Sequence, residues 1–305
     1  MVTHGKRVPK KVGCLNEGRT SSKQKAKRAK AIRELRHDYN QDLLLKAAGM
    51  ARSTFYYYQK KRQDKRINLK TQILQIYHHH QGRYGYRRIM LAVRKQGIIV
   101  NHKTVLRIMR ELGIKSLVKV KKYKSYKGEL GKIAPNLLQR NFYAGEPNQK
   151  WVTDVTEFSV AGEKLYLSPI MDLYNSEIIS YTLDRRCNGN QTVEMLKNVL
   201  SKLPEKSKLI IHSDQGWQYQ MKAWQRLFKG NRIRQSMSRK GNCLDNAAME
   251  GFFSILKSEL FYLKKYDSII TLEKDIREYI EYYNNDRIKL KLNGLSPIQY
   301  RTQAA

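Results

Sequence analysis

The chain has few of the features that mark secreted and membrane proteins. Its 305 residues include only three cysteines, Cys14, Cys187 and Cys243, and their isolation and odd number predict neither a disulfide framework nor a zinc site. No run of about 18 apolar residues occurs, which excludes a transmembrane helix. Residues 1–30 are polar and basic without an apolar centre, which excludes a secretory signal. We therefore expect a cytoplasmic protein with free structural thiols and no membrane partner.

Acidic residues are also scarce, and the resulting positive charge is concentrated in one half of the chain. The sequence has 60 Lys and Arg against 26 Asp and Glu, a net charge of +34. Residues 1–150 hold 37 of the basic residues against 8 acidic ones, a net of +29, whereas residues 151–305 hold 23 against 18, a net of +5. This asymmetry predicts a polyanion-binding arm joined to a separate functional domain, rather than only a solubilising surface. The length favours about two domains, and a hydrophobic content of 41% excludes broad disorder.

The N-terminal part is typical of a basic leader followed by a helix-turn-helix. Residues 1–40 form the leader, in which 21–38 could be helical but has too few apolar positions for us to assign a core. Residues 41–66 have an apolar stripe, a break at Gly49 and a second helix that begins with hydroxyl residues, as a helix-turn-helix requires. A plain pair of packed helices is the alternative. The basic residues of this segment, Arg52 among them, favour contact with DNA.

A second helical DNA-binding unit is predicted over residues 67–114. Asn101 can cap a helix over 102–112, which we expect to be a recognition helix. The residues of this helix that we expect to face DNA are His102, Lys103 and Arg107. The run of three histidines at 78–80 does not predict a metal site, because successive helical side chains point about 100° apart. We expect ordinary surface or interhelix histidines there.

Residues 115–147 are predicted to be a basic linker. Lys121 and Lys122 lie among tyrosines in this segment, a composition that can follow a phosphate backbone while aromatic rings pack on sugars or bases. A spacer without a defined path is the equally weighted alternative.

From residue 148 onward the pattern changes to an α/β alternation. The runs 150–158, 164–173 and 177–185 are rich in Val, Ile, Thr and Tyr and predict a three-strand meander, in which Pro169 indicates a bulge or an edge position. Further along, we expect helices over 190–203, 218–229, 245–262 and 271–284, and strands over 208–213 and 232–238. This order predicts an RNase-H-like domain over 148–285, a mixed five-stranded sheet with flanking helices. A C-terminal tail over 286–305 follows it.

Three carboxylates in this second half are the candidate catalytic residues. Asp154 follows the start of the first strand, and Asp214 ends the apolar run 209–214. Glu250 lies on the helix over 245–262, with 35 residues between it and Asp214. Two carboxylates at strand ends and a third on a later helix can hold two hard divalent cations, the equipment used to break and join phosphodiesters.

Other acidic residues are weaker candidates. Glu157 should point to the opposite face from Asp154 by strand alternation, and Asp172 is expected to be structural or solvated. Asp245 precedes the long helix and is expected to serve as its N-cap. On that helix, Asn246 and Lys257 lie on the same face as Glu250.

Three sequence blocks around these carboxylates resemble a known family. The blocks 153–158, 212–216 and 236–256 look like the catalytic blocks of the retroviral-integrase-like transposases. The resemblance is closest to bacterial insertion-sequence transposases whose coding region is split over two overlapping frames, with this chain similar to the second-frame product. Further blocks at 84–89, 134–138 and 282–300 also resemble that family, so the likeness covers roughly residues 41–305.

The resemblance implies a DNA transposase that binds double-stranded DNA, namely the terminal inverted repeats of its element and the target. Asp154, Asp214 and Glu250 would hold two Mg²⁺ or Mn²⁺ ions for 3′-end cleavage and strand transfer. By the same resemblance, Lys257 would contact DNA near the scissile phosphate, with an ordinary surface lysine as the alternative. Asn246 is expected to position either DNA or the side chain of Glu250. Arg239 and Lys240 are further predicted DNA contacts. We further expect a homo-oligomer on DNA, a nucleoid-associated location in the cytoplasm, and a first-frame product that is fused to this chain or separate from it.

Two rival functions remain open at this point. A structure-selective nuclease with an RNase-H-like fold would nick DNA without joining ends. A DNA-binding regulator of transposition with a degenerate catalytic domain would not cleave at all, and the intact acidic triad argues against it.

Overall fold

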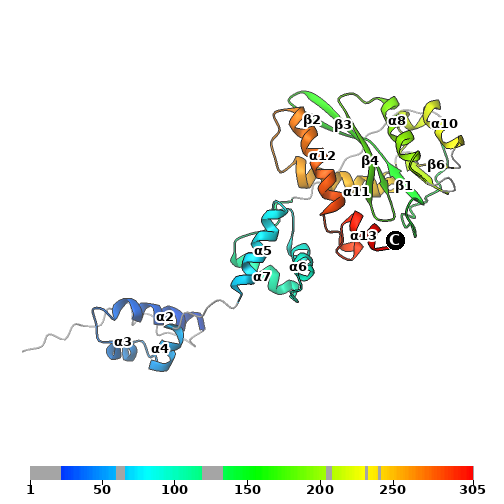
Figure 1. Ribbon diagram of the computed structural model, residues 1–305. Coiled ribbons are helices and arrows are strands. Elements are labelled where there is room, and N and C mark those ends of the chain that lie inside the picture. The colour runs from blue at the N-terminus through cyan, green and yellow to red at the C-terminus, as the bar shows by residue number, and fades with distance from the viewer. Residues whose placement is uncertain are drawn as a thin grey trace, which may run out of the picture. The chain divides into compact units, whose positions relative to one another are not determined.

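A computed structural model describes residues 22–59, 66–118, 133–203, 208–230, 233–239 and 242–304 (Figure 1). The chain divides into two compact units, Met1–Leu69 and Lys70–Ala305. In the described ranges, no helix has the length and apolar character needed to cross a membrane.

In its described residues up to Gln59, the first unit has three short helices around a small apolar core. The helices are α2 (Ser22–Leu35), α3 (Gln41–Ala47) and α4 (Arg52–Gln59). The Asn40 side chain caps α3 by accepting a hydrogen bond from the Asp42 amide at 2.9 Å. Gly49 has a φ of +58° in the turn before α4, which a residue without a Cβ adopts at little cost. The predicted helix-turn-helix over 41–66 is therefore present as two helices joined by a tight turn.

The leader predicted over 1–40 needs a correction, because α2 has a core. Ala29 and Ile32 on α2 are 3% and 0% exposed and pack with Leu44 and Phe55 of the next two helices. Two helices as short as α3 and α4 cannot cover their own apolar faces. The few apolar residues of α2, one turn apart, provide the missing side of the core.

The second unit begins within α5 (Ile67–His79), which is followed by α6 (Tyr86–Lys95) and α7 (His102–Glu111). Asn101 caps α7 by accepting a hydrogen bond from the Lys103 amide at 2.8 Å, as predicted. The ring of His80 is buried and stacks on Tyr84 with 3.7 Å between centroids. Burial is the main reason that the pKa of His80 falls to about 4. The interhelix interpretation of this histidine is confirmed.

A mixed sheet of six strands forms the centre of the second unit. The strands are β1 (Lys150–Thr153), β2 (Thr156–Val160), β3 (Glu163–Asp172), β4 (Glu177–Asp184), β5 (Ile210–Ser213) and β6 (Arg234–Met237). β3 pairs antiparallel with β4 on one side and with β2 and β1 on the other, and β1, β5 and β6 are parallel. The fold class is confirmed as α/β. The sheet has six strands rather than five, because the run predicted over 150–158 is two strands.

The interruption between β1 and β2 lies at Asp154 and Val155. β3 pairs with β1 from Ile170 onward and with β2 up to Leu167, so Pro169 and its neighbour lie opposite the interruption. The register of β3 against β4 also shifts directly after Ile170. Pro169 itself pairs in regular register with Tyr181, and the bulge lies one residue further on, where Ile179 of β4 is the extra residue. Because β3 is also an interior strand, neither predicted position, a bulge or an edge, holds for Pro169 itself.

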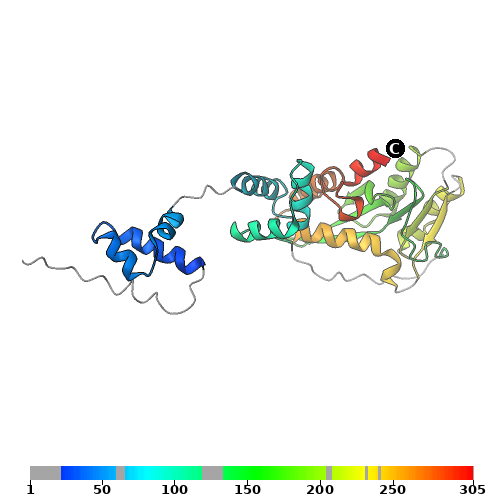
Figure 2. The same ribbon diagram turned by 90° about the horizontal axis from the view of Figure 1, so that it is seen from below.

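Helices cover both faces of this sheet (Figure 2). One face packs against α8 (Gly189–Leu200), α9 (Trp217–Gln220) and α10 (Lys222–Gly230), with Trp151, Ile211 and Trp224 in the core between them. The other face packs against α11 (Ala247–Leu256) and α12 (Ile269–Asn285) through a larger apolar core. The long helix predicted over 245–262 begins as a 3-10 turn, η1 (Cys243–Asn246), and ends as a π-helical turn, η2 (Lys257–Phe261).

The tail predicted over 286–305 also needs a correction, because this segment is folded onto the second unit. It contains η3 (Leu290–Leu292) and α13 (Pro297–Ala304). Arg301 on α13 forms ion pairs with Asp172 and with Glu177, the latter at 3.1 Å. Asp172 is fully buried and also accepts backbone hydrogen bonds at 2.9 and 3.0 Å, so its predicted structural role is confirmed.

A buried carboxylate joins the helices at the start of the second unit to its C-terminal half. Glu259 in η2 accepts hydrogen bonds from Arg287 at 2.7 and 2.8 Å, from Arg88 at 3.1 Å and from the Tyr279 hydroxyl at 2.9 Å. Its backbone carbonyl accepts a further bond from Arg83 at 3.0 Å. Three arginines from two distant segments thus converge on one residue of the helix that follows Glu250.

Candidate active site

Asp154 and Asp214 lie side by side at the carboxyl ends of two parallel strands. β1 and β5 pair in a register that places Lys150 opposite Ile210 and Val152 opposite His212. Continuing this register brings Asp154 opposite Asp214, and neighbouring strands are roughly 5 Å apart. Two aspartates that are sixty residues apart in sequence therefore become neighbours through the pairing of two short strands.

Local hydrogen bonds fix both aspartates. One carboxylate oxygen of Asp154 accepts from the amide of Val155 at 2.7 Å, and one of Asp214 accepts from the amide of Gly216 at 2.8 Å. The hydroxyl of Thr153 donates to the carbonyl of Pro169 at 2.9 Å, which holds the end of β1 against β3. The second carboxylate oxygen of each aspartate has no hydrogen-bond partner among the residues that the structure describes, so it is available for a ligand.

Glu250 is brought to the same edge of the sheet by α11. The apolar side of this helix, with Phe252 and Phe253, is buried in the core. At its start, the side chain of Asn246 donates to the carbonyl of Thr153 at 3.3 Å, so the helix is fastened to the residue before Asp154. Asn246 is 4% exposed and its side-chain oxygen is buried without a partner among the described residues.

The pKa of Asp154 is affected by both of the other carboxylates. The pKa of Asp154 is raised well above its ordinary range, first by burial, then by Asp214 and more weakly by Glu250. Burial also raises the pKa of Asp214 and of Glu250. Within the described ranges, no Lys or Arg forms an ion pair with any of the three. Negative charge gathered here without a basic partner is costly, and a bound cation is what would offset it.

The donor set fits a hard divalent cation, although the cluster is not closed. All the available ligands are carboxylate oxygens, which such cations prefer. No three His, Cys, Asp or Glu side chains in the described part of the chain are gathered tightly enough to hold a metal ion. The register of β1 and β5 makes the two aspartates direct neighbours. Glu250 would complete the set from its helix.

Asp245 is not the helix N-cap that the sequence predicted. It lies within η1, is fully buried, and accepts hydrogen bonds from Asn136 at 3.0 Å, from Arg140 at 3.0 Å and from Arg239 at 2.9 and 3.0 Å. The amide of Arg239 adds a bond at 3.0 Å. Hydrogen bonding from Arg239 is the main reason that the pKa of Asp245 lies well below its ordinary range. We refer to these four residues as the Asp245 cluster.

His212 lies near the site and was given no role by the sequence. Its ring is fully buried between the hydroxyls of Ser236, at 2.8 Å, and Ser238, at 3.1 Å. The Ser238 hydroxyl donates to the carbonyl of Ser213 at 3.3 Å, which leaves it to accept from the imidazole. Burial lowers the pKa of His212 to about 4, so the ring is neutral and ties β6 to β5 beside Asp214.

Lys257 contacts protein in this structure. Its ammonium group donates to the backbone carbonyl of Glu157 at 3.1 Å and lies 5.1 Å from the centre of the Phe158 ring. Burial lowers the pKa of Lys257. The side chain of Glu157 points to solvent and pairs with Lys164 at 3.2 Å, in agreement with its predicted placement away from the candidate catalytic carboxylates.

The remaining predicted DNA contacts stay predictions. Lys103 and Arg107 are exposed on α7, and Arg52 is exposed at the start of α4, where it pairs with Asp42 at 3.0 Å. The structure also leaves much of Arg239 exposed, with 59% of its side-chain surface accessible. Three further predicted contacts, Lys121, Lys122 and Lys240, lie outside the described residues.

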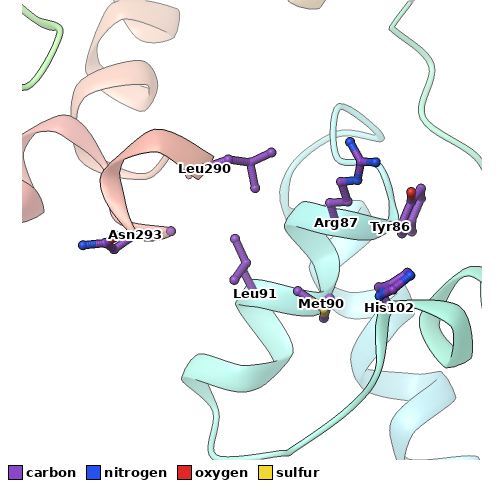
Figure 3. A pocket seen from close by; sticks show the side chains of 8 residues that line it. Tyr86, Arg87, Met90, Leu91, His102, Leu290 and Asn293 are labelled. Carbon is purple, nitrogen blue, oxygen red and sulfur yellow. The ribbon is translucent and has the colours of Figure 1, made fainter.

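A pocket of about 540 Å³ lies between α6 and the segment after α12 (Figure 3). It is lined by Tyr86, Arg87, Met90, Leu91, His102, Leu290, Asn293 and Gly294. None of these residues belongs to the segments that carry the three carboxylates. The pocket is therefore separate from the candidate active site.

Comparison with known proteins agrees with this arrangement. Residues 144–243 and 250–304 match the family described as integrase core domain, and residues 63–122 match the HTH-like domain. The chain is 53% identical over 276 residues, 90% of this chain and 98% of the relative, to the "Putative transposase InsK for insertion sequence element IS150" of Escherichia coli K12. It is 56% identical over 210 residues, 69% of this chain and 97% of the relative, to an uncharacterized transposase-like protein of Haemophilus influenzae. Among solved structures it resembles the HTLV-2 integrase catalytic core domain in complex with magnesium, with a TM-score of 0.42, 17% identity, and coverage of 52% of this chain and 99% of that one.

Proposed function

The chain belongs to the insertion-sequence transposases with an integrase core domain, and from this membership we propose that Asp154, Asp214 and Glu250 form its catalytic centre. The reaction proposed is cleavage of the 3′ ends of the element, followed by transfer of those ends into target DNA. The observation that carries the proposal is the register of β1 and β5, which makes Asp154 and Asp214 neighbours at one edge of the sheet.

The protein's own residues supply the binding and the positioning for this chemistry. The two aspartates and Glu250 present oxygen ligands for divalent ions, for which we propose Mg²⁺ or Mn²⁺ and two ions per site. When bound, such ions would polarise the scissile phosphate and stabilise the leaving 3′ oxygen. Asn246 holds the helix of Glu250 against the end of β1, and His212 holds the strand of Asp214, so the carboxylates are oriented before DNA arrives.

Both proposed steps use the same carboxylates and differ in the attacking group. When water attacks, the phosphodiester bond to the 3′ oxygen breaks and the element ends in a 3′-hydroxyl. When that hydroxyl attacks a phosphodiester of the target, a new bond joins the two DNAs and a target 3′ oxygen leaves. No covalent bond between protein and DNA is needed, so no serine or tyrosine nucleophile is assigned.

The proposed partners are the terminal repeats of the element and the target DNA. The exposed residues of α7 and the basic character of residues 1–150 support DNA binding by this half of the chain. We also propose that the chain acts as a homo-oligomer on DNA.

The test uses a duplex that carries the terminal repeat of the element, with Mg²⁺. We expect nicking at the 3′ end and transfer into a second duplex. Asp154→Ala and Glu250→Ala should abolish both reactions while binding to the duplex persists, because the proposed DNA-reading helices are untouched. Glu157→Ala is the matched control, since it removes a carboxylate three residues from Asp154 that faces solvent, and it should remain active. Full cleavage by Asp154→Ala would refute the assignment, and nicking without joining by the wild-type chain would favour the nuclease.

A further inference from the structure

The Asp245 cluster holds two arginines from distant parts of the chain at one carboxylate. Arg140 precedes β1 and Arg239 follows β6, and 105 and 6 residues separate them from Asp245. Arg239 uses two guanidinium nitrogens on the carboxylate, and Arg140 uses one there and another on the side chain of Asn242 at 3.2 Å. Both guanidinium groups are therefore fixed in direction, which removes much of the entropy cost of binding a further ligand.

The cluster keeps an unneutralised positive charge that reaches solvent. One fully buried carboxylate faces two guanidinium groups, so the cluster carries one net positive charge. The side chains of Arg140 and Arg239 are 46% and 59% exposed. Within the part of the chain that the structure describes, neither Nη1 nitrogen makes a hydrogen bond. A guanidinium group whose remaining N–H groups face solvent can donate hydrogen bonds to phosphate oxygens.

The cluster is also linked to each segment that carries a candidate catalytic carboxylate. Asn246, next to Asp245, bonds to the residue before Asp154. The amide of Ser238, next to Arg239, bonds to the carbonyl of Ser213 at 2.9 Å, one residue before Asp214. Asp245 itself lies five residues before Glu250, in the turn that opens its helix. An anion on the two arginines would thus sit on the loop that borders the active site.

We propose that Arg140 and Arg239, held in place by Asp245, bind one phosphate of the DNA strand at the active site. Arg140 is a DNA-contact residue that the sequence did not suggest, and Asp245 is the positioning residue that presents both arginines. The inference rests on the proposed function only in taking DNA as the substrate. The competing explanation is that the two arginines only stabilise the fold around Asp245. In that case DNA binding would not depend on the charges of the two arginines.

The salt dependence of binding to the terminal-repeat duplex separates these explanations. Each lost phosphate contact lowers the slope of log affinity against log salt by about one. We expect this decrease for Arg140→Gln and for Arg239→Gln, and we expect Arg140→Lys to restore the slope because it retains the charge. Arg277→Gln is the matched control, since Arg277 is similarly exposed but pairs with Glu273 along α12. Unchanged slopes in both Gln variants, with unchanged melting temperatures, would overturn the inference.

A scan with neutral methylphosphonate linkages locates the phosphate. The wild-type chain should lose about tenfold in affinity when the linkage that Arg140 binds is neutral, and Arg140→Gln should lose nothing further at that linkage. Equal losses for both proteins at every linkage would contradict a direct contact. Both measurements are made without cleavage, so a chain that binds in this way but never nicks DNA would refute the proposed function alone. A chain that nicks DNA with unaltered slopes in the variants would refute this inference alone.

Discussion

Removing the charge of Glu259 should lower the stability of the second unit more than any surface substitution. Glu259 and Arg287 are 3% and 2% exposed and share two hydrogen bonds of 2.7 and 2.8 Å. Glu259→Gln leaves the guanidinium of Arg287 buried without its counter-charge and weakens the bonds from Arg88 and Tyr279. Breaking a buried pair from one side costs about 3–5 kcal/mol. For a unit of this size, that corresponds to a decrease of roughly 6–20 °C in melting temperature.

Intrinsic fluorescence measures this unit specifically, because the three tryptophans of the chain, Trp151, Trp217 and Trp224, all lie within it. Glu273→Gln is the control. It breaks an ion pair of the same 2.7 Å length with Arg277, but on the exposed surface of α12, where the cost is below about 1 kcal/mol. If both variants melted within a degree of the wild type, the buried pair would contribute no net stability and the reasoning would be wrong.

The stability of the second unit at acidic pH should also depend on the carboxylate of Glu259. Burial alone would raise the pKa of Glu259, but the hydrogen bonds and charges of Arg287 and the charge of Arg88 lower it below its ordinary value of 4.5. The stabilisation that follows is fully present above the pKa of the unfolded chain and is lost as the pH falls through the lower pKa of the folded chain. We expect the wild type to lose its stability advantage over Glu259→Gln below about pH 4.5.

Three further predictions concern two glycines of the second unit and the side-chain cap of α7. A Cβ at Gly189 would lie 2.3 Å from the sulfur of Met221 and 3.0 Å from the ring of Trp217, so Gly189→Ala should destabilise the second unit by about 1–3 kcal/mol in thermal melts. A Cβ at Gly251 in α11 would have no atom within 4 Å. Gly251→Ala should therefore stabilise the second unit by up to about 1 kcal/mol. Destabilisation by this substitution would contradict the packing described. Asn101→Ala should remove the cap of α7 at a cost of about 1 kcal/mol and increase amide exchange in the first turn of that helix, and unchanged exchange there would show that the cap contributes nothing.

Local patterns predicted the α/β domain well, and predicted the N-terminal helix α2 and the C-terminal segment poorly. The alternation of strands and helices after residue 148 is confirmed because each element has its own apolar period. No core was predicted for α2, because Ile32 and the other apolar residues of this helix are few. The residues that they pack against belong to other helices. The segment containing α13 looked like a tail because its main anchor, Arg301 on Asp172, spans 129 residues.

The residues of the candidate site were also predicted where the signal is local and missed where the partner is distant in sequence. Asp154, Asp214 and Glu250 were proposed from short blocks, and the pairing of β1 with β5 supports the placement of the two aspartates. Asp245 was misjudged because an acidic residue before a helix is locally indistinguishable from an N-cap, and its partner Arg140 is 105 residues away. The block at 134–138 contains Asn136, another partner of Asp245, but its residues carry no local sign of that contact.

The most direct test of the catalytic assignment is a change of metal specificity at Asp154. Asp154→Cys replaces a hard oxygen ligand by a soft sulfur, which Mg²⁺ binds poorly and Mn²⁺ accepts more readily. We predict that 3′-end cleavage of the terminal-repeat duplex by Asp154→Cys is lost with Mg²⁺ and partly restored with Mn²⁺, whereas the wild type cleaves with either ion. Cleavage by Asp154→Cys at the wild-type rate with Mg²⁺ would contradict the claim that this side chain holds the metal.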